Sequence, residues 1–408
     1  MTPRSRKYDL YSDAFRAGTY ATFARMRDED PVLCQPGIDG GTPIWFVTRY
    51  DDAEAVLLDD ERFVRDPRLA LSPEQLGEEL PAFVPFIDSN MLNRDGDDHR
   101  RLRRLVSKAF TPRMIERLRP RIQEIADALI DEVSADGEME LVSAFAFPLP
   151  ITVIAELLGV PVADRERFRE WSAAMVSPAL AAAEMEQADA LLQAFVAYLL
   201  ALFAERRQDP GEDLVSALVA VEDGGDTLSE EELCSMVALL IVAGHETTVS
   251  LIGNAMLALL THPEQRSALE REPSLLPRAV EELIRFDGPV ERTLNRWAAV
   301  DVELRGRTIR RGESVIVVLG AADRDPERFD GPDTLDWTSE RARHLGFGRG
   351  SHFCLGAPLA RLEAEIALGT LLRRLPGLRL AAAAEELRRR PVPLFRSLVA
   401  LPVAWDAY

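Results

Sequence analysis

Apolar residues recur three and four positions apart along most of the chain, which is the spacing of helices that bury one face. Near the N-terminus this pattern predicts a short helix over Asp9 to Arg27. A basic helix is expected from Asp98 to near Phe110, and Thr111 followed by a proline favours a new helix at that point. Further helices are predicted over 51–58, 149–158, 163–176, a segment that ends near Arg206, 229–260, 275–286 and 355–375.

A few short segments instead have the β-branched composition and glycine turns of strands. They are 44–48, 300–304, 308–309 and 314–319, with an apolar, strand-like end over 396–403. The segment 66–92 holds several prolines and no firm period, so we expect a long loop with short helical pieces there. The fold class predicted from these patterns is mainly α with a smaller β portion.

The helix expected over 229–260 begins with Ser229-Glu230-Glu231-Glu232, the sequence of a capping box. Its length of roughly 45 Å would cross a large domain. It is apolar on most sides, so it should be buried, yet its centre reads Ala243-Gly244-His245-Glu246-Thr247-Thr248. Polar groups in the middle of a buried helix are costly. They are either satisfied core residues or part of a site, and the sequence alone favours neither reading.

Four glycines and one cysteine lie within the eleven residues from Gly346 to Gly356. Glycine lets the backbone approach a ligand closely. An apolar-periodic helix follows, so Cys354 should lie at or just before a helix N-terminus, where a thiolate is favoured. With Phe347 as a flat apolar wall, this arrangement suits a large planar metal cofactor, and haem iron held by a cysteine thiolate is chemistry of that kind.

Other readings of this segment are open. A lone cysteine in an apolar stretch is usually a small buried side chain. A zinc site fits poorly, because Cys34 and Cys234 are remote and structural zinc uses close ligand pairs. A dinucleotide-binding loop is a near miss, because Ser351 stands where its third glycine belongs.

Composition narrows the class of protein further. The 408 residues are 47% hydrophobic, which is ample for a large core, and carry a formal net charge of −20, which argues against a nucleic-acid partner. Three scattered cysteines suit a reducing compartment. No run of 18 uninterrupted apolar residues and no signal peptide is present, so we expect no membrane anchor and a cytoplasmic protein.

The segment Phe347-Gly348-x-Gly350-x-His352-x-Cys354-x-Gly356 resembles the haem-binding signature of the cytochrome P450 superfamily. Two more motifs of that family recur in order. Ala243-Gly244-x-Glu246-Thr247 is similar to its acid–threonine pair, and Glu282-x-x-Arg285 to its structural pair. The resemblance covers essentially the full chain and is greatest to the soluble actinobacterial branch that tailors polyketides and other secondary metabolites.

The resemblance implies a triangular, α-rich haem domain over 1–408, with a long central helix, small antiparallel sheets and no fused reductase. It implies haem b (iron protoporphyrin IX), with Cys354 as the metal ligand and Thr247 and Glu246 as the catalytic pair. The remaining cofactor-binding residues that it implies are His99, Arg103, Ala243, Arg296, Phe347, Gly348, His352 and Gly356.

The activity implied is that of a haem-thiolate monooxygenase. It would insert one oxygen atom from O2, by hydroxylation or epoxidation, into a lipophilic polyketide or macrolide, terpenoid or steroid. Electrons would come from a ferredoxin or flavodoxin with its NAD(P)H reductase, and we expect a monomer. A peroxide-driven peroxygenase would usually lack the acid–threonine pair, and a haem sensor would need an output domain. Two interpretations are open for a set of basic residues. They form either a basic patch on which the electron donor docks or a solvated helix face, and the residues are Arg100, Arg101, Arg104 and Arg349.

Some expectations concern the surroundings of the site. The substrate pocket should have an apolar lining, which the family places at Leu92, Val176, Leu239, Leu240, Val290 and Leu398. Thr334 stands where many relatives carry an arginine, so how Glu282 is satisfied is open, with Arg324 or Arg341 as substitutes. His245 is read as a packing residue and His344 as a surface residue.

Overall fold

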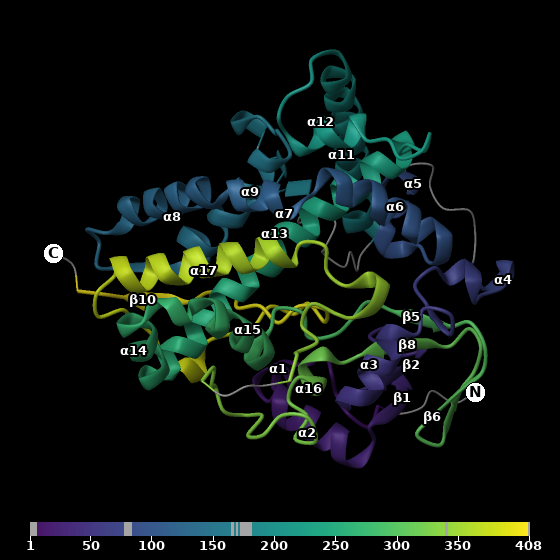
Figure 1. The fold of residues 1–408 in the computed structure, drawn as a ribbon. Helices are drawn as coiled ribbons and strands as arrows, with labels where there is room; N and C mark the ends of the chain where they lie inside the picture. The colour runs from purple at the N-terminus through teal and green to yellow at the C-terminus, as the bar shows by residue number, and fades with distance from the viewer. Residues whose placement is uncertain are drawn as a thin grey trace. The chain divides into compact units, whose positions relative to one another are not determined.

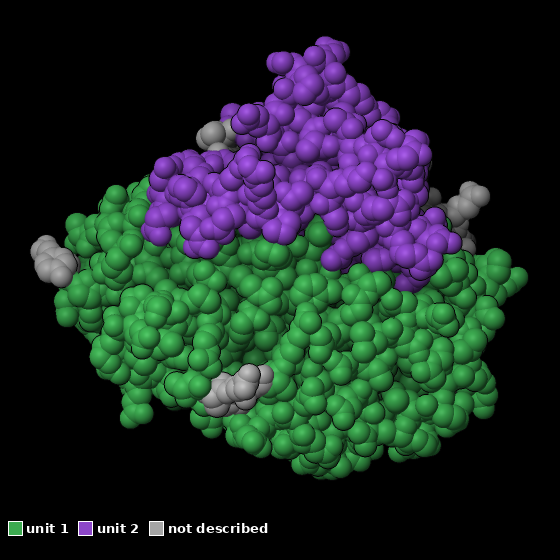
Figure 2. Space-filling model, in the orientation of Figure 1, with its two compact units in different colours: residues 1–77, 126–146, 247–408 green, residues 78–125, 147–246 purple. Residues whose placement is uncertain are grey.

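The protein is described from a computed structural model, which covers residues 6–76, 84–164, 167–168, 170–171, 182–338 and 342–406 (Figure 1). Its residues divide into two compact units (Figure 2). Unit 1 contains 1–77, 126–146 and 247–408, and unit 2 contains 78–125 and 147–246.

Helices dominate the described residues. The α-helices are α1 Asp13–Ala17, α2 Thr19–Glu29, α3 Tyr50–Leu58, α4 Pro73–Leu76, α5 Pro85–Asp88, α6 Gly96–Ala109, α7 Pro112–Arg117, α8 Arg119–Val133, α9 Pro148–Leu157, α11 Ala182–Gln208, α12 Leu214–Ala220, α13 Glu230–Thr261, α14 Pro263–Arg271, α15 Leu276–Asp287, α16 Leu319–Ala322 and α17 Ala357–Arg374. Short 3-10 turns include η1 Pro67–Leu69, η2 Met91–Asn93 and η6 Gly350–His352.

The strands of the described residues belong to unit 1 and are short. They are β1 Val32–Pro36, β2 Pro43–Val47, β3 Phe63–Val64, β4 Glu138–Glu140, β5 Arg296–Ala298, β6 Val302–Leu304, β7 Arg307–Ile309, β8 Ser314–Val317, β9 Arg379–Leu380 and β10 Pro402–Ala404. One sheet has the order β1-β2-β8-β5-β3, a second has β4-β10-β9, and β6 and β7 form a third. The expectation of antiparallel sheets is wrong for one pair, because β2 and β8 run parallel.

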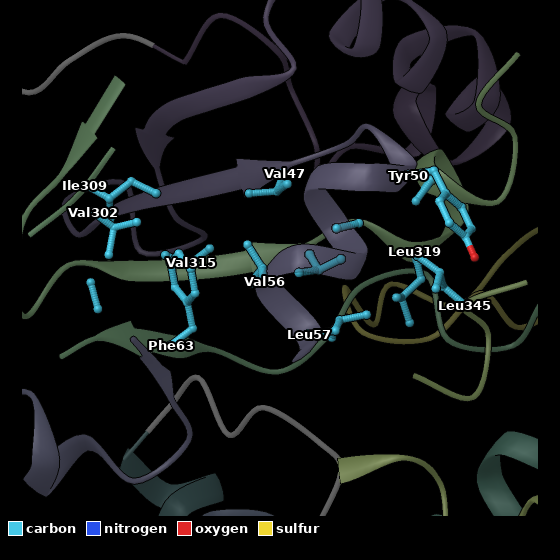
Figure 3. Packing of buried hydrophobic residues seen from close by; sticks show 14 of the residues in the cluster. Val47, Tyr50, Val56, Leu57, Phe63, Val302, Ile309, Val315, Leu319 and Leu345 are labelled. Atoms are coloured by element: carbon cyan, nitrogen blue, oxygen red, sulfur yellow. The ribbon is translucent and has the colours of Figure 1, made fainter. Parts of the chain in front are cut away.

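A cluster of buried apolar residues joins α3 to the largest sheet of unit 1 (Figure 3). Val56 and Leu57 from α3 belong to the same cluster as Val47 from β2 and Val315 from β8. The cluster also contains Leu345, which is fully buried and directly precedes the glycine-rich loop. The loop therefore begins at a fixed point of the core.

The central helix forms as its sequence predicts. Ser229 Oγ accepts the backbone N–H of Glu232 at 3.1 Å, and the Glu232 carboxylate accepts the N–H of Ser229 at 2.9 Å. These two bonds are the reciprocal capping box, and α13 then runs to Thr261. Among the described residues, α13 alone is long and apolar enough to cross a membrane. Because most of its apolar stretch is buried, α13 has the character of a core helix.

The structure departs from the predicted elements in a few places. The N-terminal helix is broken at Gly18 into α1 and α2. The helix that starts after Thr111, whose Oγ1 accepts the Met114 N–H at 3.2 Å, ends at Arg117 before α8 begins. Strand β1 was not predicted. The helix expected over 163–176 lies mostly outside the described residues.

Candidate active site

The glycine-rich loop is a tight turn closed by its own backbone. Gly348 and Gly350 both have φ of +71°, a left-handed conformation that favours glycine. The N–H of Gly348 donates to the Leu345 carbonyl at 2.7 Å, and the N–H of Cys354 donates to the Phe347 carbonyl at 2.9 Å. A Cβ on Gly350 would lie 2.7 Å from the backbone oxygen of Leu57 in α3. Glycine is therefore required by the backbone path as well as by close packing.

Cys354 lies just before the N-terminus of α17, as the sequence predicts. The helix begins at Ala357 with Gly356 as its N-cap residue, and a proline stands in its first turn. Cys354 is half-buried and forms no disulfide. Cys234 differs, because it is fully buried in unit 2 and burial raises the pKa of its thiol to about 12. Burial therefore distinguishes Cys234 from Cys354, which is half-buried just before a helix.

The residues of the loop fit a planar metal cofactor. Among the described residues, no group of three or more His, Cys, Asp or Glu side chains is placed to hold a metal ion. Phe347, Phe353 and Leu355 are apolar and yet only half-buried. A single thiolate beside an incompletely covered apolar surface suits an iron whose other ligands come from a porphyrin. The fold and this loop together define the class of a haem-thiolate protein.

Two of the residues predicted to bind the haem propionates, Arg296 and His352, belong to unit 1. Arg296, on β5, is 2% exposed and donates through Nη1 to the Phe63 carbonyl at 2.9 Å, with Asp60 at 3.6 Å. His352 lies in the η6 turn of the glycine-rich loop and is half-buried. A buried guanidinium with further N–H groups can bind a carboxylate such as a haem propionate.

The middle of α13 leaves one set of side chains accessible although the helix is otherwise mostly buried. Leu239, Leu240 and Thr247 are half-buried and Ala243 is exposed. Leu240, Ala243 and Thr247 follow the i, i+3, i+7 spacing of one helix face. This face therefore offers an apolar surface with a single hydroxyl, which suits a pocket wall.

Glu246 and His245 are both buried in unit 2, at 7% and 1% exposure. His245 Nδ1 lies 2.9 Å from the Ile241 carbonyl and must carry a proton, because a carbonyl only accepts. His245 Nε2 lies 3.6 Å from Glu246 Oε1, and Phe147 stacks edge-on against the imidazole at 5.8 Å. His245 is thus a packing residue, as predicted, and it also faces the carboxyl group of Glu246.

The other candidates of unit 2 lie on separate elements. His99 and Arg103 are four residues apart on α6 and so share a helix face; His99 is buried at 3% exposure and Arg103 is half-buried. Leu92 is half-buried in η2. Val176 lies outside the described residues, as does Arg341.

Val290 and Leu398, the remaining pocket candidates, lie in unit 1. Val290 pairs with Phe395 and Leu398 with Arg389 in isolated β-bridges. Val290 is half-buried, whereas Leu398 is 4% exposed, and its Cδ1 lies 3.8 Å from where a Cβ on Gly253 of α13 would stand. The C-terminal segment at Leu398 is therefore close to α13.

The pair Glu282 and Arg285 is satisfied without an arginine at position 334. Arg285 donates to both Glu282 carboxylate oxygens, at 2.7 and 2.8 Å, and the N–H of Asp336 donates to the same carboxylate at 3.0 Å. Arg285 also donates to the backbone carbonyls of Asp323, Pro332 and Thr334. Arg324, one of the substitutes considered, instead donates to Phe286 and Asp333. The backbone carbonyl of Thr334 thus accepts a hydrogen bond from Arg285, so residue 334 takes part in this network without an arginine side chain.

The basic patch predicted for docking is largely neutralised. Arg100 is paired with Asp97, Arg101 with Asp226 and Glu232, Arg104 with Asp223, and Arg349 with Glu54. The acids that pair with Arg101 and Arg104 come from the segment between α12 and α13 and from the first turn of α13. Helix α6 is therefore not a bare basic surface.

Sequence reasoning missed two buried groups near the site. Glu363 on α17 is 1% exposed, and burial raises its pKa well above that of an ordinary carboxyl, although a hydrogen bond with Thr248 opposes the shift. His344 is buried at 8% exposure, so its assignment to the surface was wrong. The position of Glu363 on an apolar helical face could have indicated that its carboxyl group is buried. His344 contacts Glu281 of α15, 63 residues away in sequence, and its burial carried no local signal.

Comparison with known proteins identifies the family. The family model for cytochrome P450 matches residues 38–166 and 178–376. Cytochrome P450 107B1 of Saccharopolyspora erythraea is 46% identical over 396 residues, 96% of each chain. The mycinamicin IV hydroxylase/epoxidase of Micromonospora griseorubida is 46% identical over 406 residues, 99% of each chain. The solved structure of PksS, the cytochrome P450 of the bacillaene polyketide synthase of Bacillus subtilis, superposes with a TM-score of 0.92 at 40% identity, covering 98% of this chain and all of that one.

The chain therefore belongs to the cytochrome P450 family. It is a monooxygenase with iron protoporphyrin IX as its cofactor, and it uses O2, a lipophilic substrate and an electron-donating redox partner. The predicted family, enzyme class and cofactor are confirmed. The individual site residues stay predictions.

Proposed function

We propose that this cytochrome P450 holds haem iron through Cys354 and inserts one oxygen atom into a lipophilic polyketide or macrolide. The observation that carries the proposal is the single, half-buried Cys354 at the end of a glycine-rich loop and at the start of a helix. The hydroxylase/epoxidase of mycinamicin IV and the P450 of the bacillaene polyketide synthase are similar over nearly the whole chain, which supports this substrate class.

In the proposed site, Cys354 supplies the thiolate and the glycines supply the close approach of backbone to the porphyrin. Arg296 and His352 of unit 1 would bind propionate oxygens; for His99 and Arg103 this role rests on the family resemblance alone. When bound, the haem supplies activation of O2, which the thiolate promotes by donating electron density. Phe347 would supply a flat apolar wall to the cofactor. Gly356 gives α17 a start without a side chain near the sulfur, since a Cβ there would lie 3.9 Å from Cys354 Sγ.

The catalytic pair is proposed to move protons. Thr247 carries the hydroxyl on the accessible face of α13, where it can donate a hydrogen bond. Glu246, buried one residue earlier, supplies protons to this hydroxyl or to water. His245 orients the Glu246 carboxyl group by facing it at 3.6 Å.

The substrate is proposed to lie against apolar side chains. Leu239, Leu240 and Ala243 supply the accessible face of α13. For Leu92, Val176, Val290 and Leu398, the assignment to the substrate pocket rests on the family resemblance alone. An apolar lining with few polar groups favours a substrate with a large hydrocarbon skeleton.

We also propose that residues 1–408 act as a single haem domain, as a cytoplasmic monomer with a separate ferredoxin or flavodoxin and its NAD(P)H reductase. The arginines of α6 are the docking candidates, although acids of the same unit already pair with them. Reversing the charge at Arg100, which is paired only with the exposed Asp97 in the described contacts, should slow reduction by the ferredoxin. The effect should shrink as salt rises, and a rate that does not respond to salt would contradict docking on α6.

The experiment that tests the proposed function uses purified protein, a redox partner, NADPH and a macrolactone probe. The probe should shift ferric iron from low to high spin, and isotopically labelled O2 should place one labelled atom in each product molecule. Product formed only with added hydrogen peroxide, and without label from O2, would show a peroxygenase instead.

A further inference from the structure

His344 lies in the core of unit 1 and makes two specific polar contacts. The backbone N–H of Gly346 donates to its Nδ1 at 3.1 Å, which fixes that nitrogen as an acceptor. The proton of a neutral ring must then be on Nε2, which lies 3.2 Å from Glu281 Oε2. His344 therefore links the first glycine of the Cys354 loop to helix α15.

Glu281 continues this link to helix α17. Arg361 donates to Glu281 through Nε at 2.6 Å and through Nη2 at 2.9 Å, a two-pronged charged pair. Although burial raises the pKa of Glu281, hydrogen bonds from His344 and Arg361 lower it to about 2. Glu281 is thus a carboxylate over the working pH range and can hold both partners.

Arg361 is the member of the cluster that acts on the ligand loop. Its guanidinium lies 4.5 Å from the centre of the Phe347 ring, and its charge interacts with Cys354. Phe347 is the residue whose carbonyl accepts the Cys354 N–H, at 2.9 Å. One arginine therefore braces the turn that holds the cysteine and places a positive charge near its sulfur.

We propose that His344 is a positioning residue for the thiolate ligand, which it serves by holding the loop at Gly346 and by orienting Arg361 through Glu281. This inference rests on the proposed function, in which Cys354 binds haem iron. A positive charge near the thiolate favours the reduced iron, because reduction adds negative charge. Loss of the cluster should therefore lower the midpoint potential and loosen the haem.

The test is a double-mutant cycle on the holoenzyme. In His344→Asn the shorter side chain can still accept the Gly346 N–H, because asparagine makes such bonds to the backbone two residues further along in turns. It cannot reach Glu281. Arg361→Gln removes the charge. Each variant should have a lower midpoint potential and should lose haem to an acceptor globin about tenfold faster. The double variant should match the more affected single variant, because both changes break one network.

Two further variants keep the result interpretable. Arg373→Gln removes the same charge from the same helix, where Arg373 pairs with Asp127 and is 58% exposed, and it should leave the potential unchanged. Arg361→Lys keeps the charge and should keep the potential closer to that of the natural protein, even if Arg361→Gln fails to fold.

Two outcomes would overturn the inference: additive shifts in the double variant, or a potential that does not change when His344 or Arg361 is replaced. The proposed function fails separately. It fails if the unaltered protein shows no thiolate-type Soret band in its ferrous carbon-monoxide complex, whatever the variants do.

Discussion

At the scale of single residues, the surroundings of each group decide its chemistry. Cys234 is sealed in an apolar interior, which raises the pKa of its thiol, whereas Cys354 is partly accessible and lies at a helix start. Thr247 is half-buried, whereas Thr248, next to it, is 2% exposed and bonded to Glu363. Two adjacent threonines thus differ in burial and in hydrogen bonding, and only Thr247 offers an accessible hydroxyl.

Thr247→Ala tests the role of the accessible hydroxyl. The variant should still consume NADPH and O2, but it should release more hydrogen peroxide per product because protons are no longer delivered in order. Product yield per NADPH is the measurement. Thr261→Ala is the control, because Thr261 lies at the far end of the same helix and donates to the Leu257 carbonyl. Unchanged coupling in Thr247→Ala would count against the proton path.

Asp323→Asn tests a buried carboxyl group through pH. Burial raises the pKa of Asp323 from 3.8 to about 6, while its Oδ1 accepts the Leu345 N–H at 2.6 Å. The folded state thus binds this proton more tightly than the unfolded state. The contribution of Asp323 to the free energy of unfolding is therefore fully present below pH 3.8 and is lost as the pH rises through about 6. Asparagine can keep the hydrogen bond and cannot ionise.

The Tm of Asp323→Asn relative to that of the unaltered protein should therefore rise between about pH 4 and pH 7, by the equivalent of up to about 3 kcal/mol. Thermal melting of the holoenzyme at several pH values measures it. A difference in Tm that stays constant across this range would mean that Asp323 does not titrate there.

At the scale of elements, local signals and long-range contacts act together on each helix. Helix α13 is fixed at its start by a capping box that the sequence shows, and its polar centre is set by neighbours that the sequence does not show. Helix α15 is tied to the 323–336 segment by Arg285, which donates to three backbone carbonyls there. These bonds replace the expected arginine at position 334.

Ser229→Ala tests the start of α13. Loss of an N-cap hydroxyl costs about 1 kcal/mol, because the Glu232 N–H then has no side-chain acceptor. The expected result is a fall in Tm of a few degrees with an unchanged haem spectrum, measured by thermal melting. Ser229→Asp, which can accept the same N–H, is the matched control and should stay near the original Tm. An equal loss in both variants would show that the cap contributes nothing.

At the scale of the whole molecule, the sequence predicted most of the long helices and the loop that carries Cys354. These features depend on neighbours in the chain: helical periodicity, capping residues, and glycines at positions of positive φ. The two- and three-residue strands β3, β5 and β9 were not separately predicted, because each exists only through pairing with a distant strand. Periodicity could not reveal that β2 and β8 run parallel.

The candidate site divides in the same way. Cys354, the glycines and the Glu282–Arg285 pair stand in motifs that a single sequence shows. His344 pairs with Glu281 and Arg104 with Asp223, and both acids come from other parts of the chain. Contacts of this kind are chosen by tertiary packing, so residue type and spacing could not predict them.

The central claim is that the sulfur of Cys354 binds the haem iron, and the most direct measurement is the absorption spectrum of the ferrous carbon-monoxide complex. The purified protein, Cys34→Ser and Cys234→Ser should all show the red-shifted Soret band of a thiolate ligand. Cys354→Ser should lose that band while keeping its fold by circular dichroism. A thiolate-type band that persists in Cys354→Ser, or one that disappears in Cys234→Ser, would contradict the account.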